Sequence, residues 1–138
     1  MSLLYLHIPY CKRICAYCDF FRSASLATLP AALDAMRSEM ERRRDYLGGD
    51  PRIRTIYFGG GTPSLCAPQR LQRLIDTASG LWDCSSPEEI TVEVNPDDVT
   101  DDYVAALRDT AVDRISLGIQ SFDDGLLRAM NRRHTAAQ

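Results

Sequence analysis

The sequence has no long hydrophobic run and no excess of positive charge. No apolar stretch approaches the ~20 residues that a membrane-spanning helix requires, and the N-terminus at residues 1–5 has neither the basic region nor the cleavage pattern of a secretory signal. The net charge of the 138 residues is −3, which does not favour binding to nucleic acid or to an anionic membrane. We therefore expect a cytoplasmic protein that has no nucleic-acid partner and that meets a membrane, if at all, through other proteins.

Several familiar catalytic patterns are also missing. No Ser, His and Asp residues suggest a hydrolytic triad, and no Gly-Lys-Ser/Thr follows the glycines at 59–61, which excludes a phosphate-binding loop. No repeat, low-complexity segment or linker divides the chain. Its 45% hydrophobic and 25% charged residues are typical of one globular domain. In a reducing compartment, clustered cysteines indicate metal or redox chemistry rather than disulfides.

Three of the five cysteines form the pattern Cys-x3-Cys-x2-Cys at Cys11, Cys15 and Cys18. Three thiolates on one loop can bind three irons of a [4Fe–4S] cluster and leave the fourth iron open to another ligand. A zinc site with His7 as its fourth ligand is an alternative, although structural zinc sites usually use two separated ligand pairs. A redox pair of Cys15 and Cys18 would leave Cys11 unused. The remaining two cysteines are expected to be structural: Cys66 and Cys84.

Segments typical of strands and helices alternate along the chain. We expect strands at 3–8, 52–58, 89–95 and 114–120, helices at 25–47, 68–81, 100–110 and 123–130, and the start of another helix at 135–138. This alternation predicts a parallel sheet with right-handed crossovers. Because parallel strands need both faces covered, we expect these 138 residues to be the N-terminal part of a longer protein or a truncated gene product.

The ends of the expected strands carry the unusual residues, and ligands of α/β sheets bind beyond those ends. Glu93 and Gln120 could each be an ordinary exposed residue, but a carboxylate buried at a strand end needs a partner such as a ribose diol or an ammonium group. Arg132 is either a solvated helix end or a clamp for a carboxylate. The strand-end residues are His7 with the cysteine loop, Gly59 to Pro63, Glu93 with Asn95, and Gln120 with Ser121.

Five ordered motifs resemble the radical S-adenosylmethionine (radical SAM) superfamily. In particular, they are similar to the oxygen-independent coproporphyrinogen III oxidase family and its haem-chaperone branch. The motifs occupy 5–18, 59–64, 93–96, 116–122 and 131–132. The resemblance implies an α/β fold that is the N-terminal part, about four β/α units, of a radical SAM (β/α)6 partial barrel with a parallel sheet. Residues 1–138 would then be a radical SAM core domain that is incomplete at its C-terminus.

The resemblance also implies the cofactors. Cys11, Cys15 and Cys18 would bind a [4Fe–4S] cluster, and the methionine part of SAM would chelate the open iron. In active members of the superfamily, one electron from the cluster cleaves SAM to a 5′-deoxyadenosyl radical, which implies an electron donor such as flavodoxin or ferredoxin. The residues implied to contact SAM are Tyr5, Tyr17, Gly60, Gly61, Thr62, Glu93, Gln120 and Arg132.

Two features of the sequence indicate which branch of this family the chain resembles. Coproporphyrinogen dehydrogenases of the family carry a further cysteine two residues after the third ligand, where this chain has Phe20. They also have a long extension before the first tyrosine, whereas Tyr5 lies near the start. Both features resemble the haem-chaperone branch, which delivers haem to acceptor proteins and implies haem binding by the full-length protein. Enzymatic turnover of a porphyrin stays open, and the alternatives are a dehydrogenase that oxidatively decarboxylates coproporphyrinogen III and an inactive truncated fragment.

Overall fold

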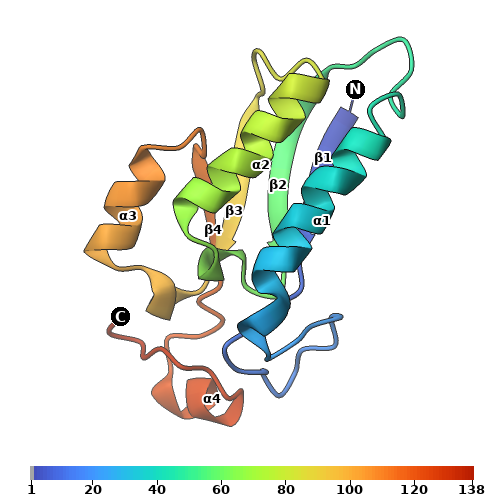
Figure 1. Ribbon diagram of the computed structural model, residues 1–138. Coiled ribbons are helices and arrows are strands. Elements are labelled where there is room, and N and C mark those ends of the chain that lie inside the picture. The colour runs from blue at the N-terminus through green and yellow to red at the C-terminus, as the bar shows by residue number, and fades with distance from the viewer. Residues whose placement is uncertain (1) are drawn as a thin grey trace.

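A computed structural model describes residues 2–138 as alternating strands and helices around one sheet (Figure 1). The strands are β1 (Ser2–Ile8), β2 (Ile53–Gly60), β3 (Glu89–Val94) and β4 (Arg114–Leu117). The helices are α1 (Leu29–Arg42), α2 (Pro68–Leu81), α3 (Asp101–Arg108) and α4 (Asp124–Ala129), with 3-10 helices at Leu26–Thr28, Pro63–Leu65 and Pro96–Asp98. The sheet order is β1-β2-β3-β4 and every pairing is parallel. The α/β class and the parallel sheet expected from the sequence are confirmed.

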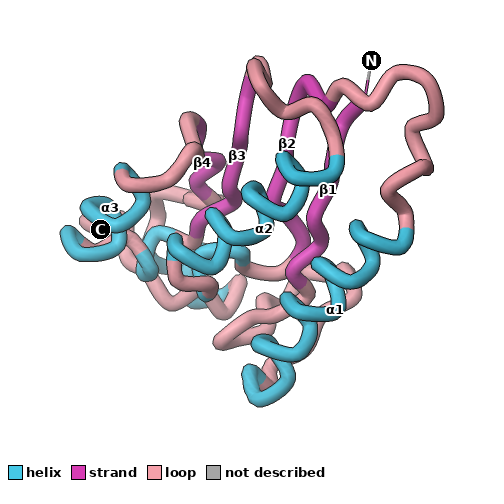
Figure 2. Tube along the Cα trace, turned by 45° about the horizontal axis from the view of Figure 1, so that its top comes forward, coloured by secondary structure: helices cyan, strands magenta, loops and turns pink. Residues whose placement is uncertain are grey.

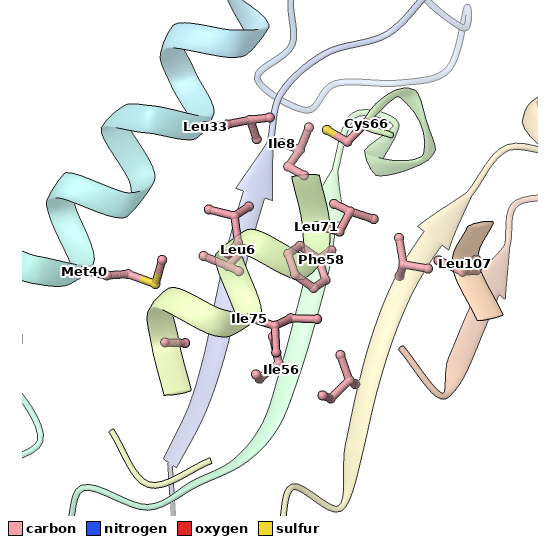
Figure 3. Close-up of a cluster of buried hydrophobic side chains, with 14 of the residues drawn as sticks. Leu6, Ile8, Leu33, Met40, Ile56, Phe58, Cys66, Leu71, Ile75 and Leu107 are labelled. Carbon is pink, nitrogen blue, oxygen red and sulfur yellow. The ribbon is translucent and has the colours of Figure 1, made fainter. Parts of the chain in front are cut away.

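The helices α1 and α2 cover the same face of the sheet, as the two views in Figures 1 and 2 agree. Alternate strand residues point to this face because successive side chains of a strand project to opposite sides. Figure 3 shows Leu6, Ile56 and Phe58 of the strands packed toward Met40 of α1 and Ile75 of α2. Phe58 is completely buried. This core fixes the positions of the strands and therefore of the loops at their carboxyl ends.

The opposite face of the sheet is rich in polar and aromatic side chains. Tyr5 pairs in register with Tyr57, and the two rings stack with centroids 6.0 Å apart. Two residues further along the strands, His7 of β1 pairs with Gly59 of β2, and Glu93 of β3 pairs with Ser116 of β4. Tyr5, Tyr57 and Glu93 therefore share the face of the sheet that α1 and α2 leave open.

Two elements end three or more residues before the position that the sequence predicts. The first long helix ends at Arg42 rather than near residue 47, because Arg43 leaves the helical conformation, with φ of −102° and ψ of 18°, and the chain continues in turns. The fourth strand ends at Leu117 rather than at residue 120. There the Ile119 amide turns back to bond Leu117 O at 3.0 Å, and Gln120 has a φ of 66°, which a strand cannot accommodate.

The expected helix at 135–138 is not formed. Instead the side chain of Gln138 accepts a hydrogen bond from the Thr135 amide at 2.9 Å, which closes a turn. Within residues 2–138, none of the helices combines the length and the apolar character needed to cross a membrane.

Candidate cofactor site

A pocket of about 360 Å³ opens at the carboxyl ends of the four strands. The cysteine loop after β1 forms one side, and residues at the carboxyl ends of β2, β3 and β4 and in the segments that follow them form the rest, as expected for a ligand site in a parallel α/β sheet. The structure brings together in its lining all the residues that were predicted to bind the cluster or SAM except Tyr5: Cys11, Cys15, Tyr17, Cys18, Gly60, Gly61, Thr62, Glu93, Gln120 and Arg132. Their roles as ligands stay predictions.

The cysteine loop is held to neighbouring segments by its backbone. The Cys11 amide donates to Ser23 O at 2.9 Å, and the Ala16 amide donates to Met130 O at 3.1 Å. All three thiols are free, with Cys11 buried and Cys15 and Cys18 half-buried at the pocket wall. The loop therefore presents three thiols to one space without a disulfide between them.

The thiols are not gathered around the position of a single metal ion. Among residues 2–138, no three or more Cys, His, Asp or Glu side chains lie close enough together to hold one metal ion. A [4Fe–4S] cluster attaches each thiolate to a different iron, so its ligands need not converge on one point. His7, the candidate fourth zinc ligand, accepts or donates a hydrogen bond with Tyr5 Oη at 3.0 Å and does not line the pocket. The zinc alternative finds no support in this geometry.

The glycine turn after β2 approaches the cysteine loop too closely for any larger residue. A Cβ on Gly61 would lie 2.6 Å from Tyr10 O and 3.0 Å from Cys11 Sγ. Gly60 has a φ of 119°, a conformation that favours glycine. Thr62, which follows Gly61, donates a hydrogen bond from Oγ1 to Cys11 Sγ at 3.5 Å. The turn thus exposes backbone groups to the pocket and contacts a candidate ligand directly.

We expect Gly61→Ala to disturb the cysteine loop, because the added methyl group meets backbone atoms of Tyr10 that have no rotamer to change. Iron retained after anaerobic reconstitution should fall well below that of the unmodified protein, while far-ultraviolet circular dichroism stays unchanged. Gly80→Ala is the matched control, since no atom lies within 4 Å of its added Cβ. Equal iron content in both variants would contradict the close packing described here.

Glu93 faces the pocket rather than solvent outside the sheet. Its Oε1 accepts from Tyr57 Oη at 2.8 Å, and its Oε2 accepts from the Gly60 amide at 3.1 Å. Burial, followed by the hydrogen bond to Glu93, raises the pKa of Tyr57, so Tyr57 keeps its proton and remains a donor. The carboxylate of Glu93 is therefore fixed in orientation before any ligand arrives.

Tyr5 lies on β1 beside Tyr57 and does not line the pocket. Its ring stacks on Tyr57, and burial together with the charge of Glu93 raises its pKa. Contact between Tyr5 and SAM stays a prediction, and in this structure Tyr5 reaches the site through Tyr57. Sequence reasoning missed Tyr57. The signal that could have found it is its position on β2, two residues before Gly59, on the same side of the strand.

Arg132 connects three parts of the pocket. Its guanidinium donates from Nη1 to Cys15 Sγ at 3.4 Å, and from Nη2 to Asn95 Oδ1 at 2.7 Å and Gly118 O at 2.6 Å. This geometry contradicts the alternative of a solvated helix end. Its Nε is buried without a hydrogen-bond partner among the described residues, which leaves a donor for an anionic ligand group.

Gln120 owes its place in the pocket lining to unusual backbone geometry. Its φ of 66° is in the left-handed region, which residues other than glycine rarely occupy. The turn before it is supported by His134, a buried residue whose Nε2 lies 2.9 Å from Ile119 O. Sequence reasoning gave His134 no catalytic role, and the structure shows it in contact with the backbone beside the site.

The two cysteines outside the loop do not line the pocket. Cys66 is almost fully buried, and burial raises its pKa to about 11, which keeps it a neutral thiol. Cys84 is half-buried, and burial raises its pKa as well. Their surroundings are those of packed structural thiols.

A family model for the radical SAM superfamily matches residues 5–138. The chain therefore belongs to the radical SAM superfamily, whose members in general use a [4Fe–4S] cluster and SAM. The donor set described above fits both groups: three free thiols on one loop, a carboxylate, and a guanidinium with a free donor.

Within the superfamily, the chain is similar to particular curated proteins. The chain is 42% identical to the heme chaperone HemW of Lactococcus lactis, over 97% of this chain and 34% of that protein. It is 36% identical to the heme chaperone HemW of Bacillus subtilis, over 97% of this chain and 36% of that protein. The chain thus spans about a third of the length of these curated relatives.

A solved structure shows the same fold. The coproporphyrinogen III oxidase HemN of Escherichia coli, a radical SAM enzyme, matches with a TM-score of 0.80 and 29% identity. The match covers 96% of this chain and 31% of that one. It confirms the expected radical SAM architecture for the part of the fold that this chain supplies.

Proposed function

We propose that these residues are the cluster- and SAM-binding part of a haem-chaperone-type protein in haem and porphyrin metabolism. The observation that carries the proposal is the convergence of three free thiols with Gly60, Glu93 and Arg132 on one pocket. The similarity to the heme chaperone HemW of two bacteria supports the assignment to the haem-chaperone branch. Residues 1–138 would form a radical SAM core domain whose remaining units lie in the part that the relatives have in addition.

Each side of the pocket suits a different part of the cofactors. The thiols of Cys11, Cys15 and Cys18 would hold three irons, and the cluster when bound would supply one electron to SAM. The oriented carboxylate of Glu93 can accept hydrogen bonds from a ribose diol or an ammonium group. The guanidinium of Arg132 can donate to a carboxylate.

The remaining candidates would complete the SAM site. Tyr17 offers a ring that is half exposed beside the cysteines and suits contact with adenine. The backbone of Gly60 and Gly61, with the Thr62 hydroxyl, lies where the methionyl part would approach. Gln120 and Tyr5 stay in the proposed set, the latter through its stacking on Tyr57.

Phe20 favours the chaperone branch over porphyrin oxidation. It lines the pocket at the position where the family's dehydrogenases have a further cysteine, and the residue is 68% exposed. A phenyl ring at this place supplies no thiolate for redox chemistry or metal binding. The similarity to HemN keeps oxidative decarboxylation of coproporphyrinogen III as the second candidate function.

The proposed partners follow from this function. They are SAM, haem or a porphyrin, an electron donor such as flavodoxin or ferredoxin, and a haem-acceptor protein, in a reducing cytoplasmic compartment that keeps the thiols free. Haem would bind to the full-length protein.

Two parallel incubations distinguish haem delivery from porphyrin oxidation. Full-length protein, reconstituted anaerobically, is incubated with coproporphyrinogen III, SAM and a reductant, and separately with haem. We expect a stable Soret band with haem and no protoporphyrinogen IX, because the pocket has a phenyl ring where the dehydrogenases have a thiol. Protoporphyrinogen formation in step with SAM consumption would overturn the chaperone proposal in favour of the dehydrogenase.

A further inference from the structure

A buried carboxylate, Asp98, lies behind the cofactor pocket and outside its lining. It is the last residue of the 3-10 helix Pro96–Asp98 after β3, and its side chain is only 4% exposed. Burying a carboxylate is unfavourable unless hydrogen bonds and opposite charges compensate. The partners of Asp98 therefore indicate what it does.

Three partners surround this carboxylate. Lys12 Nζ lies 2.5 Å from Oδ1, and Ser64 Oγ donates to Oδ2 at 2.8 Å. Arg133 Nη2 lies 3.6 Å from Oδ1. Each oxygen of the carboxylate is thus in contact with a group from a different part of the chain.

Each of these partners belongs to a loop that forms the pocket. Lys12 follows Cys11 directly. Ser64 lies in the 3-10 helix Pro63–Leu65, immediately after the glycine turn. Arg133 follows Arg132. A single buried side chain therefore contacts three of the loops whose relative positions define the pocket.

Further contacts make the arrangement more rigid. Ser64 Oγ also accepts from the backbone amide of Asn95 at 3.2 Å, and the side chain of the same Asn95 accepts from Arg132. Arg133 Nη2 forms an ion pair with Asp97 Oδ2 at 2.5 Å, and both of these side chains are largely buried. The side chain of Lys12 is 44% exposed, so water weakens its ion pair with Asp98. The buried hydrogen bond between Ser64 and Asp98 should then be the strongest single link.

We propose that Asp98 is a positioning residue that fixes three segments relative to one another: the cysteine loop, the glycine turn at residues 59–61, and the segment that contains Arg132 and Arg133. Asp98 thereby determines how firmly the site retains its cluster and SAM. The inference rests on the proposed function, because it concerns the same pocket. Asp98 acts through the partners that surround it, as groups outside a ligand shell generally do when they orient the ligands.

A purely structural role for Asp98 makes a different prediction. It would lower Tm while leaving SAM binding unchanged in the fraction that is folded. Asp98→Asn separates the two roles, because the amide keeps the size and an acceptor for Ser64 but removes the charge that attracts Lys12 and Arg133.

The experiment uses full-length protein, reconstituted anaerobically, well below the Tm of each variant. Two quantities are measured: the rate of cluster loss to an iron chelator, and the Kd of SAM from its effect on the electron paramagnetic resonance (EPR) signal of the reduced cluster. For Asp98→Asn we expect cluster loss about tenfold faster and SAM binding about tenfold weaker. Asp101→Asn, an exposed carboxylate three residues away, should stay within about twofold of the unmodified protein.

Wild-type values in a folded Asp98→Asn protein would overturn the inference and leave the proposed function intact. Absence of any cluster or SAM effect in the unmodified protein would instead refute the proposed function. If Asp98→Asn does not fold, Ser64→Ala decides, because it frees the glycine turn from Asp98 and leaves both cationic partners in place. Weaker SAM binding by Ser64→Ala supports the positioning role, and unchanged binding overturns it.

Discussion

Cys15→Ser is expected to prevent assembly of a stable [4Fe–4S] cluster and to remove SAM binding with it. The three thiols of the loop are free and line one pocket, and a serine hydroxyl is a far poorer iron ligand than a thiolate. Cys15 also accepts a hydrogen bond from Arg132 at 3.4 Å, so the substitution disturbs the contact between the loop and the ends of β3 and β4. The measurement is iron and sulfide content after anaerobic reconstitution of the full-length protein.

Cys84→Ser is the matched control for this substitution. Cys84 is half-buried like Cys15 but does not line the pocket. We expect its iron content and visible absorption to equal those of the unmodified protein. Equal cluster content in the Cys15→Ser and Cys84→Ser proteins would remove Cys15 from the ligand set.

Glu93→Gln should weaken SAM binding by about ten- to a hundredfold. The carboxylate accepts hydrogen bonds from Tyr57 Oη and the Gly60 amide, and a hydrogen bond to a charged group contributes ~1.5–3 kcal/mol. The amide has a single acceptor oxygen, so either Tyr57 or Gly60 loses its partner and a ligand ammonium or ribose loses a charged acceptor. Cluster content should remain unchanged, because within residues 2–138 the hydrogen bonds of the Glu93 carboxylate go to Tyr57 and Gly60 and not to a cysteine.

The Kd of SAM, from titration of the reduced protein, measures the effect. Glu88→Gln serves as control, since Glu88 is an exposed residue whose ion pair with Arg54 lies at the amino-terminal end of β3. Unchanged SAM affinity in Glu93→Gln, with iron content intact, would place Glu93 outside the SAM site.

The sequence was sufficient to predict the order of elements, because the apolar periodicity of each strand and helix is local. The strand at 3–8 and the helix at 68–81 agree with the structure to within a residue or two. The ends of elements were predicted less well where backbone geometry decides. Arg43 leaves the helical conformation and Gln120 has a positive φ, and a pattern of hydrophobic residues reveals neither property.

The candidate site was predictable to the extent that it depends on strand ends. Parallel strands bring their carboxyl ends together, so the cysteine loop, Gly60 and Glu93 could be assigned to one edge from the sequence alone. The orientation of the Glu93 side chain could not be predicted, because it depends on the register of β2 against β3. Asp98 was missed for a similar reason: its partners, Lys12 and Arg133, are distant in the sequence and meet only in the fold.

The central claim is that the three thiols hold a cluster with one iron open to SAM. EPR spectra of the reconstituted, reduced full-length protein, recorded with and without SAM, test it most directly. We predict the signal of a reduced [4Fe–4S] cluster whose g values shift when SAM is added, with the shift lost in Cys15→Ser and weakened in Glu93→Gln. A cluster signal that SAM leaves unchanged, or no cluster at all in the reconstituted protein, would contradict the account.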